Sequence, residues 1–545
     1  MQIYEYFCNL ALSFAFFYPK TWLRTTQINL FVLLRKILFL FSVILIFIRT
    51  FAPELNSLTI NKMKRLYALT GLLLCFSIAT KAGGLMTNTN YHIAFDRMFA
   101  RGASMEIDAA YSNPAGLAWG HEGFQLSLNF QKPWQNRDIE TTIPNYLANP
   151  ALQYAGYGIQ QKFNGKASAP IVPALFASYK KDKWVISSMI GIVGSGGFVK
   201  YEEGIPMFNV MTMGKIYEKS VAAFMANPQS PIITPDMFNI DSEVKGKQYI
   251  YGGQLNFTYK VTDNFAAAVG LRANYYDGYN RGYVTATTLP QLGNMQLMDL
   301  QLDVTQRAWG FSPIVSVDYH QGPLTIAARY EFRSKINTKN DTKALSVTMM
   351  GQQTDIKGLA SQLGNEATLK AIAAAMGDEM AGKIKNYMPD EHVRYDMPSL
   401  FVAAVGYEFT PSLRAALEYH FFDDTHAQMA DNRQKELEHG THEILAGVEW
   451  DINKKFTVSC GGQRTDYGLS DNYQQNTSFA CDSYSVGLGG AWNINEKMRL
   501  NVSYFCTLYS DYTHEQQNYL GTPYPGKDVY SRTNNVIGVG LDYKF

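Results

Sequence analysis

The sequence predicts a transmembrane antiparallel β-barrel of about 14 strands. Three observations lead to this fold class: composition, strand-like alternation of side chains, and turns that are short on one side only. Charged residues make up 17% of the 545 residues, below the roughly 25% of soluble domains. Aromatic residues make up 14%, yet the mean hydropathy of −0.16 is too polar for a bundle of membrane helices. A barrel reconciles these values, because its lipid-facing and lumen-facing residues alternate and cancel in any average.

The alternation of apolar and polar residues is clearest at the C-terminus, where every second residue from Ile537 to Phe545 is apolar. The segments 324–333 and 413–421 repeat this pattern, with Arg and Glu on the face opposite the apolar residues. Successive side chains of a strand point to opposite faces, so such strands fit between lipid and a polar lumen. A soluble β-sandwich also alternates, but its turns are short at both ends.

Tight turns follow one another along the chain, each joining two strand-like segments. They fall at 181–182, 262–263, 321–322, 410–411, 452–453 and 494–495. One further strand before these hairpins (124–132) and one after them (534–545) give an even strand number, as in bacterial barrels. The connections between hairpins are long, and those at 194–246 and 334–397 carry helix-like spacing, which predicts partly helical extracellular loops.

The chain before the strands divides into three segments. Residues 63–82 have a basic start, a short apolar core and a small final residue, which predicts a signal peptide. Residues 1–62 hold an apolar stretch that Arg35 and Lys36 interrupt, so we expect a non-mature extension; an uncleaved anchor is the alternative. Residues 83–123 remain as a candidate hatch ahead of the barrel at 124–545.

The lumen of such a barrel is too wide for its own side chains to fill, so it is either a water channel or blocked by another segment. The candidate hatch contains the turn signal Asn113-Pro114-Ala115. Asn can bond its own backbone two residues on, and Pro fixes φ and cannot extend a helix. We interpret these three residues as the end of the hatch and as part of its gate.

A signal peptide, a plug of this length ending in Asn-Pro-Ala, and a barrel of about fourteen strands together resemble the FadL/TodX family of outer-membrane transporters. That family carries fatty acids and aromatic hydrocarbons. The likeness covers residues 63–545 in architecture, but in motif only Asn113, Pro114 and Ala115 with the approach at 101–104. It implies that the hatch closes the barrel and that its Asn-Pro-Ala turn contacts a kink in the third strand. Substrate then leaves sideways into the membrane.

The third strand is rich in glycine, which marks a bulge or a close backbone approach when it lies inside a strand. We predict the kink at Gly194, Gly196 and Gly197; the alternative is that these glycines merely begin the second loop. The mature start at 83–85, Gly-Gly-Leu, departs from the family's frequent Gly-Phe, and the loop lengths differ. Substrate identity is therefore open.

Three lumen-facing arginines, Arg272, Arg329 and Arg414, are candidates for binding a carboxylate head group, because Arg binds carboxylates with two parallel hydrogen bonds. The alternative for each is an ion pair with a neighbouring Glu. We predict no cofactor and no metal site, since Cys460, Cys481 and Cys506 do not form a CxxC motif. The net charge of +1 gives no sign of a nucleic-acid partner.

The sequence thus predicts a non-enzymatic channel of the bacterial outer membrane for passive uptake of fatty acids or aromatic hydrocarbons, by hatch-gated lateral diffusion. Expected partners are the hydrophobic small molecule, outer-membrane lipid, and the barrel-assembly machinery, which recognises a terminal aromatic such as Phe545; we expect a monomer. A porin or a surface-binding, adhesin-type barrel is the alternative. An outer-membrane lipid hydrolase is disfavoured, because the sequence holds no GxSxG or HExxH signature.

Overall fold

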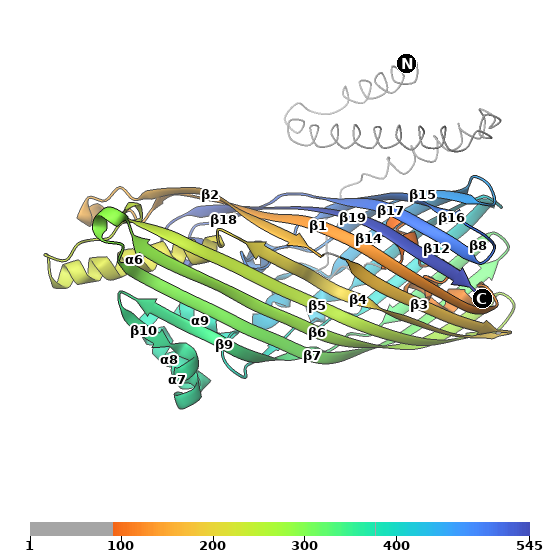
Figure 1. Ribbon diagram of the computed structural model, residues 1–545, viewed down its shortest axis with the longest axis horizontal. Helices are drawn as coiled ribbons and strands as arrows, with labels where there is room; N and C mark the ends of the chain where they lie inside the picture. The colour runs from red at the N-terminus through yellow and green to blue at the C-terminus, as the bar shows by residue number, and fades with distance from the viewer. Residues whose placement is uncertain (1–90, 170, 377) are drawn as a thin grey trace, which may run out of the picture. The chain divides into compact units, whose positions relative to one another are not determined.

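The computed structural model describes residues 91–545 apart from 170 and 377. In this range the strands form one antiparallel sheet that closes on itself (Figure 1). Closure occurs where the first strand, β1 (Gly123–Tyr146), pairs with the last strand, β19 (Gly526–Lys544). The predicted signal peptide and the extension before it lie outside the described residues, as do the first residues of the candidate hatch.

Eighteen of the nineteen strand segments in the described residues make up fourteen wall strands, because four wall strands are interrupted once. The first half of β1, next to the short turns, pairs with β3 (Val172–Lys181), and its second half pairs with β2 (Tyr157–Ser168). Strands β2 and β3 therefore form one wall strand. Three more interrupted strands are β8 (Leu324–Glu331) with β9 (Asn337–Met349), β11 (His392–Arg394) with β12 (Leu400–Thr410), and β17 (Met498–Tyr509) with β18 (Tyr512–Gln516).

The other wall strands are continuous. They are β4 (Trp184–Tyr201), β5 (Phe238–Lys260), β6 (Phe265–Thr288), β7 (Gln296–Gln321), β13 (Leu413–Phe422), β14 (Thr441–Asp451), β15 (Phe456–Asp466) and β16 (Ser483–Asn493). The short β10 (Gln352–Asp355) only extends β9 as a hairpin. The prediction of a barrel of about fourteen strands is confirmed.

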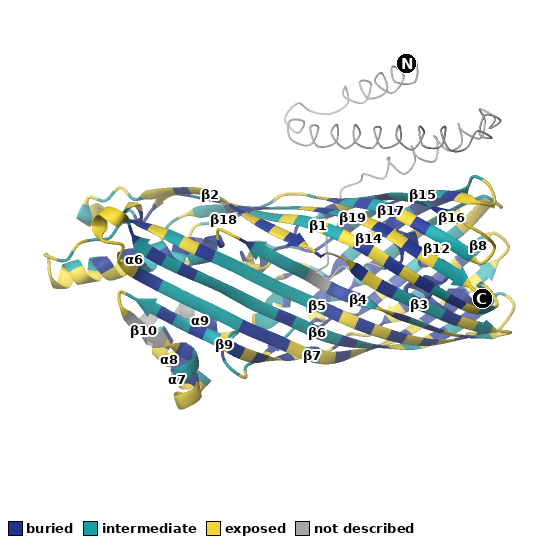
Figure 2. Ribbon diagram, in the orientation of Figure 1, coloured by how far each residue is buried: buried dark blue, intermediate teal, exposed yellow. Residues whose placement is uncertain are grey.

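The predicted alternation of side chains is confirmed along the strands. In β8, Ile326 and Tyr330 are exposed on the outer face, whereas Thr325 and Arg329 are buried on the lumen side. Figure 2 shows the same alternation of exposed and buried residues on the strands near the short turns. An exposed face of Leu, Ile, Val and aromatic residues is stable in lipid, where it costs no contact with water.

All six predicted tight turns join neighbouring strands of the barrel. Two of them show why the chain reverses there. In the β14–β15 turn the side chain of Asn453 accepts the backbone N–H groups of Lys455 and Phe456, at 2.8 and 3.0 Å. In the β16–β17 turn the side chain of Asn495 likewise accepts two backbone N–H groups. Such side-chain bonds replace the ladder bonds that a turn cannot form.

The long connections at the opposite end carry helices. One helix, α6 (Pro206–Ala226), lies between β4 and β5, and three more, α7 (Ile356–Leu363), α8 (Asn365–Met376) and α9 (Asp378–Lys385), lie between β10 and β11. Asp355 caps α7 by accepting the N–H of Gly358 at 3.0 Å. Among the described residues, no helix is both long and apolar enough to cross a bilayer.

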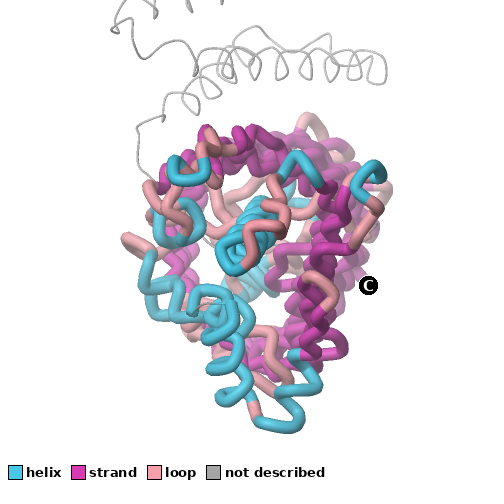
Figure 3. Tube along the Cα trace, turned by 90° about the vertical axis from the view of Figure 1, so that its left-hand side faces the viewer, coloured by secondary structure: helices cyan, strands magenta, loops and turns pink. Residues whose placement is uncertain are grey.

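Strand β4 continues to Tyr201, and β9 to β11 occupy part of the second long connection. Both connections are therefore shorter than the segments 194–246 and 334–397 suggested. Short 3₁₀ turns occupy Pro150–Leu152, Pro235–Met237, Pro290–Leu292, Asp424–His426, Ala430–Glu436, Asp471–Tyr473 and Tyr519–Gly521. Figure 3 looks along the barrel from the helix-bearing end, with the strands as a ring around the lumen.

Candidate functional site

The described part of the N-terminal segment, residues 91–122, crosses the lumen and is called the plug. It contains α4 (Ile93–Arg97), α5 (Ala109–Ser112) and the 3₁₀ turn η3 (Pro114–Trp119). Helix α4 contacts β15, β16, β17 and β19, whereas η3 contacts β4 to β7 on the other side of the ring. Most plug residues are buried, so the plug fills the lumen near the short turns.

The turn Asn113–Ala115 is fixed to the wall by polar contacts. They are Asn113 Nδ2 donating to Asp318 Oδ2 (3.0 Å), Ala115 N–H donating to Ser316 Oγ (3.2 Å) and Thr258 Oγ1 donating to the Pro114 carbonyl (2.8 Å). The following residue, Gly116, allows this approach, because a Cβ there would lie 2.3 Å from the Ser104 carbonyl oxygen. These hydrogen bonds go to β5 and β7, while η3 also contacts the third wall strand, β4, which the resemblance implied as the partner of the turn.

The plug reaches the third wall strand, β4, through α5 and the residues around it. Ile107 and Tyr111 pack in one buried cluster with Met189 and Val193 of β4. On the next strand, Asn256 donates to the Ala110 carbonyl at 2.8 Å. A shift of α5 would therefore be transmitted to β4 by direct packing.

A wall gap interrupts the pairing between β4 and the β2/β3 strand. The β3–β4 ladder ends at Leu175 and Ile190, and the β2–β4 ladder begins again at Ala167 and Val199. We define the wall gap as the described residues between these points, namely 168, 169, 171–174 and 191–198. On its other side β4 remains paired with β5, but the register shifts twice, between Ile192 and Gly194 and between Ser195 and Gly197.

The predicted kink positions Gly194, Gly196 and Gly197 all lie within the wall gap. Gly197 has φ +73°, a left-handed conformation that strains any residue with a Cβ. The two register shifts interrupt the regular pairing of β4 with β5, as β-bulges do where they bend a strand. The glycines therefore lie inside the third wall strand, and the second loop begins only after Tyr201.

The gap is lined by apolar side chains. Ala169, Val172 and Ile192 are each at most 8% exposed and form one cluster. Tyr91, at the start of the plug, and Tyr249 of β5 pack against them. The lumen beside the gap thus offers an apolar surface.

Ion pairs clamp the plug to the opposite wall. Arg97 donates to Glu449 of β14, and both side chains are fully buried. Arg499 of β17 pairs with Glu106 of the plug, and the backbone N–H of Gly102 donates to Glu418 of β13 at 2.6 Å. Because buried charges are costly to leave unpaired, these contacts oppose movement of the plug as a whole.

The three candidate arginines for a carboxylate ligand each meet an acidic group of the protein itself. Arg272 pairs with Glu331, and Arg329 lies 4.0 Å from the same carboxylate while donating to the Tyr111 carbonyl. Arg414 pairs with Glu449 and with Asp451, the latter at 2.7 Å. An added carboxylate would have to compete with these internal partners.

The wall residues that hold the plug were not singled out from the sequence. Gln254, Asn256 and Thr258 recur at every second position of β5, as do Ser316 and Asp318 in β7. Polar residues at this spacing near a short turn were the available signal. It was ambiguous, because a water-filled lumen would show the same pattern.

A Ser–His–Asp cluster lies where α4 meets the wall, but its geometry differs from that of a hydrolase. His92 Nε2 faces both Ser127 Oγ and Asp542 Oδ1 at 3.0 Å, while Nδ1 accepts the N–H of Ala94. A catalytic triad places the serine on one ring nitrogen and the carboxylate on the other. His92 therefore caps α4 and joins it to β1 and β19.

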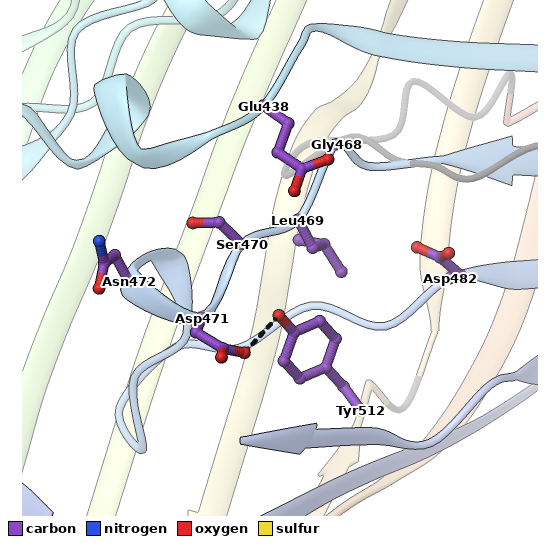
Figure 4. Close-up of a pocket in the computed structure, with 8 residues that line it drawn as sticks. All are labelled: Glu438, Gly468, Leu469, Ser470, Asp471, Asn472, Asp482 and Tyr512. Carbon is purple, nitrogen blue, oxygen red and sulfur yellow. Dashed lines mark hydrogen bonds between the residues drawn. The ribbon is translucent and has the colours of Figure 1, made fainter. Parts of the chain in front are cut away.

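A surface hollow of about 530 Å³ lies among the outer loops near the β15–β16 connection (Figure 4). It is lined by Glu438, Asp471, Asp482 and other polar residues, and Tyr512 donates to Asp471 at 2.8 Å. In the part of the chain that the structure describes, no group of His, Cys, Asp and Glu is arranged to hold a metal ion. The lining of the hollow is mainly acidic and polar, with Leu469 and the ring of Tyr512 as its apolar parts.

The barrel and plug were compared with solved structures. A FadL homologue from Pseudomonas aeruginosa aligns with 86% of this chain and 100% of its own, at a TM-score of 0.55 and 12% identity. The chain has the fold of a FadL homologue.

Other solved structures superpose less well on this FadL-type barrel. The toluene transporter TodX of P. putida has a TM-score of 0.49 and 12% identity over 81% of this chain and 94% of its own. The toluene transporter TbuX of Ralstonia pickettii has a TM-score of 0.44 and 12% identity over 80% and 94%. No family model and no curated protein matches the sequence.

Proposed function

We propose that this FadL-type barrel is an outer-membrane channel for passive uptake of hydrophobic molecules, and that they leave through the wall gap. The observation that carries the proposal is an apolar gap beside a lumen that the plug blocks. A molecule that enters from the helix-bearing end meets the plug before it reaches the short turns. The gap between the β2/β3 strand and β4 is the remaining route, and it leads into lipid.

The physical driving force for this route is the hydrophobic effect. Moving apolar surface out of water is favourable by roughly 25 cal/mol per Å², so an alkyl chain or aromatic ring gains free energy by passing from the lumen into the bilayer. Ala169, Val172 and Ile192 offer an apolar path between the two. The channel thus needs no cofactor, no covalent step and no energy source, in keeping with a transporter and not an enzyme.

The plug supplies the gate in this proposal. The turn Asn113–Ala115 holds the plug to β5 and β7, and α5 packs on β4 just beside the gap. Movement of α5 changes the packing on Met189 and Val193, and through them the width of the gap. Gly194, Gly196 and Gly197 let β4 bend there without strain.

A narrowing of the gap tests the exit route. We expect Ala169→Trp to reduce the uptake of radiolabelled laurate and of toluene at least about tenfold, because the indole fills the apolar gap. Ala328→Trp, on the half-exposed outer face of β8, is the matched control and leaves uptake unchanged. Heat-modifiable migration on gels checks that both variants fold. Equal uptake by both variants would show that substrate does not pass through the gap.

A second experiment tests the gate. Replacing Asn113 and Pro114 by Ala removes the hydrogen bond to Asp318 and the fixed φ of the turn. We expect altered laurate uptake, whereas unchanged uptake would contradict the gate. Liposome swelling in sucrose separates the porin alternative, because a plugged barrel admits no sugar and a porin does. If the protein still binds to cells after the plug is removed, the result would favour the adhesin-type barrel.

A further inference from the structure

The strands of the barrel are much longer on one side than on the other. Strands β5, β6 and β7 have 23, 24 and 26 residues, whereas β13 to β16 have 10 or 11 residues each. About ten tilted residues cross the apolar part of an outer membrane, so the long strands extend well beyond it. Figure 1 shows them running on toward the helix-bearing end. The outer faces of these extensions therefore meet lipid head groups and not acyl chains.

A row of aromatic residues marks the end of the apolar band on this side. Tyr251, Tyr275 and Trp309 are ladder partners on β5, β6 and β7, and the ring centroids of Tyr275 and Trp309 lie 4.8 Å apart. On the short-turn side of this row the exposed residues are apolar, among them Leu255 and Leu271. Tyr and Trp collect at the level of the lipid head groups in membrane proteins. These three residues, called the aromatic row, therefore mark the boundary between lipid tails and head groups.

Four cations form a second row on the same face, further from the membrane. They are ladder partners across four neighbouring strands, β2, β4, β5 and β6, and are called the basic row: Lys166, Lys200, Lys245 and Arg281. The row faces outward, because Lys245 and Arg281 are an even number of residues from the exposed Leu255 and Leu271. The Cβ atoms of direct partners lie about 5 Å apart, and like charges at that distance destabilise a sheet. The basic row thus requires compensation.

The carboxylates of the protein compensate the basic row only in part. Glu243 is shared by two of the lysines, Lys200 and Lys245, at 3.0 and 2.5 Å. Arg281 donates to Asp303 at 2.9 Å. Ion pairs that face solvent contribute little to stability, and one shared carboxylate does not neutralise two ammonium groups. An external anion at this row would therefore gain free energy.

Cations outnumber carboxylates from just beyond the aromatic row up to the basic row. On β2 and on β4 to β7, the outward-facing charged residues at these levels are six cations and two carboxylates, namely Arg307, Lys247, Lys166, Lys200, Lys245, Arg281, Asp277 and Asp303. Glu202 and Glu243 lie on the far side of the basic row, away from the membrane. The face thus presents an excess of positive charge to the head-group layer.

The height of the basic row selects the class of lipid. Lys245 is six residues from Tyr251 along β5, which is about 20 Å of strand and about 15 Å along the axis of a barrel with strands tilted by about 40°. The head-group layer of a phospholipid leaflet is only about 5–8 Å thick. Cations recur between the two rows, with Arg307 at the first level and Lys247 at the second. An anionic head group that reaches all these levels is a phosphorylated sugar and not a simple phosphodiester.

We propose that the basic row, together with Lys247 and Arg307, binds the phosphorylated sugar head group of a glycolipid in the outer leaflet. The inference goes beyond the proposed function and does not rest on it, because these side chains lie outside the barrel. Lys and Arg donate charge-assisted hydrogen bonds to phosphate oxygens, and their clusters at a membrane surface bind anionic head groups. The ring of Tyr279 lies 5.4 Å from Lys247 Nζ and 4.3 Å from the Arg281 guanidinium carbon, so cation–π contacts help to position both cations.

The test uses the purified full chain in a nonionic detergent with EDTA, so that no divalent cation bridges lipid and carboxylate. Native mass spectrometry measures binding of two probes: lipid A with both of its sugar phosphates, and lipid A from which both phosphates have been removed. We expect the wild type to bind the phosphorylated form at least about tenfold more tightly. The row variant, Lys200→Gln/Lys245→Gln/Arg281→Gln, should lose this preference and bind both forms alike.

A matched variant loses the same charge at the opposite end of the barrel. Lys181, Lys183 and Lys497 are exposed at the β3–β4 and β16–β17 turns. We expect Lys181→Gln/Lys183→Gln/Lys497→Gln to keep the preference of the wild type for phosphorylated lipid A. Heat-modifiable migration on gels checks that both variants fold. Phosphorylated lipid A stabilises only the protein that binds it, so it should raise the melting temperature of the wild type and the matched variant more than that of the row variant.

Three results would overturn the proposal. Equal affinity of the row variant and the wild type for phosphorylated lipid A would show that the site is not at the basic row. Equal binding of the two lipid A forms by the wild type would show that the phosphates are not recognised. Displacement of phosphorylated lipid A by an equal concentration of phosphatidylglycerol would show a general anionic surface with no preference for a sugar head group.

Discussion

The ion pair between Arg97 of the plug and Glu449 of β14 yields the sharpest prediction for the gate. Glu449 is fully buried and accepts hydrogen bonds from both Arg97 and Arg414. Glu449→Gln keeps the shape but removes the negative charge, which leaves the buried Arg97 guanidinium unpaired. Breaking a buried pair in this way costs about 3–5 kcal/mol, so we expect plug attachment to weaken by a factor of roughly 150 to 5,000.

Ion conductance across planar bilayers measures the attachment. The wild type is expected to stay closed, whereas Glu449→Gln opens frequently, because the detached plug exposes the lumen. Glu408→Gln, at an exposed position of β12, is the matched control and stays closed. Replacing both Arg97 and Glu449 by Met removes both charges and restores closure in large part. A Glu449→Gln protein that stays closed, with an unchanged melting temperature, would refute the clamp.

Further predictions concern the plug, the core and a loop. We expect Gly102→Val to let sucrose into liposomes, because a Cβ there would lie 2.8 Å from the Ala404 Cβ and would displace the plug. A variant barrel that still excludes sucrose would contradict this contact. Phe176 belongs to the buried cluster that the plug forms with the wall. We expect Phe176→Ala to lower the free energy of unfolding in urea by about 3–5 kcal/mol, and a loss below about 1 kcal/mol would show that neighbouring side chains fill the cavity. In the outer loops, burial raises the pKa of Asp424 to about 7 from 3.8. Protonated Asp424 therefore stabilises the folded loop fully below about pH 4, and this stabilisation is lost as the pH rises through 7. We expect proteolysis of the loop to be faster at pH 9 than at pH 5. Asp424→Asn should remove that difference.

The barrel was predictable because its signals are local. Alternation at every second residue and turns such as the one at Asn453 depend only on nearby sequence, and the closed structure follows from repeating them. The helices of the outer connections also have local periodicity. The turn Asn113–Ala115 was recognisable as a turn for the same reason, and the structure places it in the lumen.

The contacts of the site were less predictable, because they join residues hundreds of positions apart. The alternation of side chains along a strand correctly placed Arg272, Arg329 and Arg414 in the lumen. It does not indicate which carboxylate lies beside each arginine. Likewise, the family resemblance implied a contact of the turn with the third wall strand, and η3 does contact β4, but the hydrogen bonds of the turn to β5 and β7 were not foreseen. Only the register of neighbouring strands decides such partners.

The sequence by itself determined that the chain is a barrel, which faces of its strands meet lipid, and where its short turns fall. Those properties follow from the two-residue period of a strand and from single-residue turn chemistry. The tertiary structure alone decided that β4 leaves its neighbour between Ile190 and Val199, and that the basic row forms across four strands. Both depend on strand register, which closure of the whole sheet sets and which no local pattern encodes.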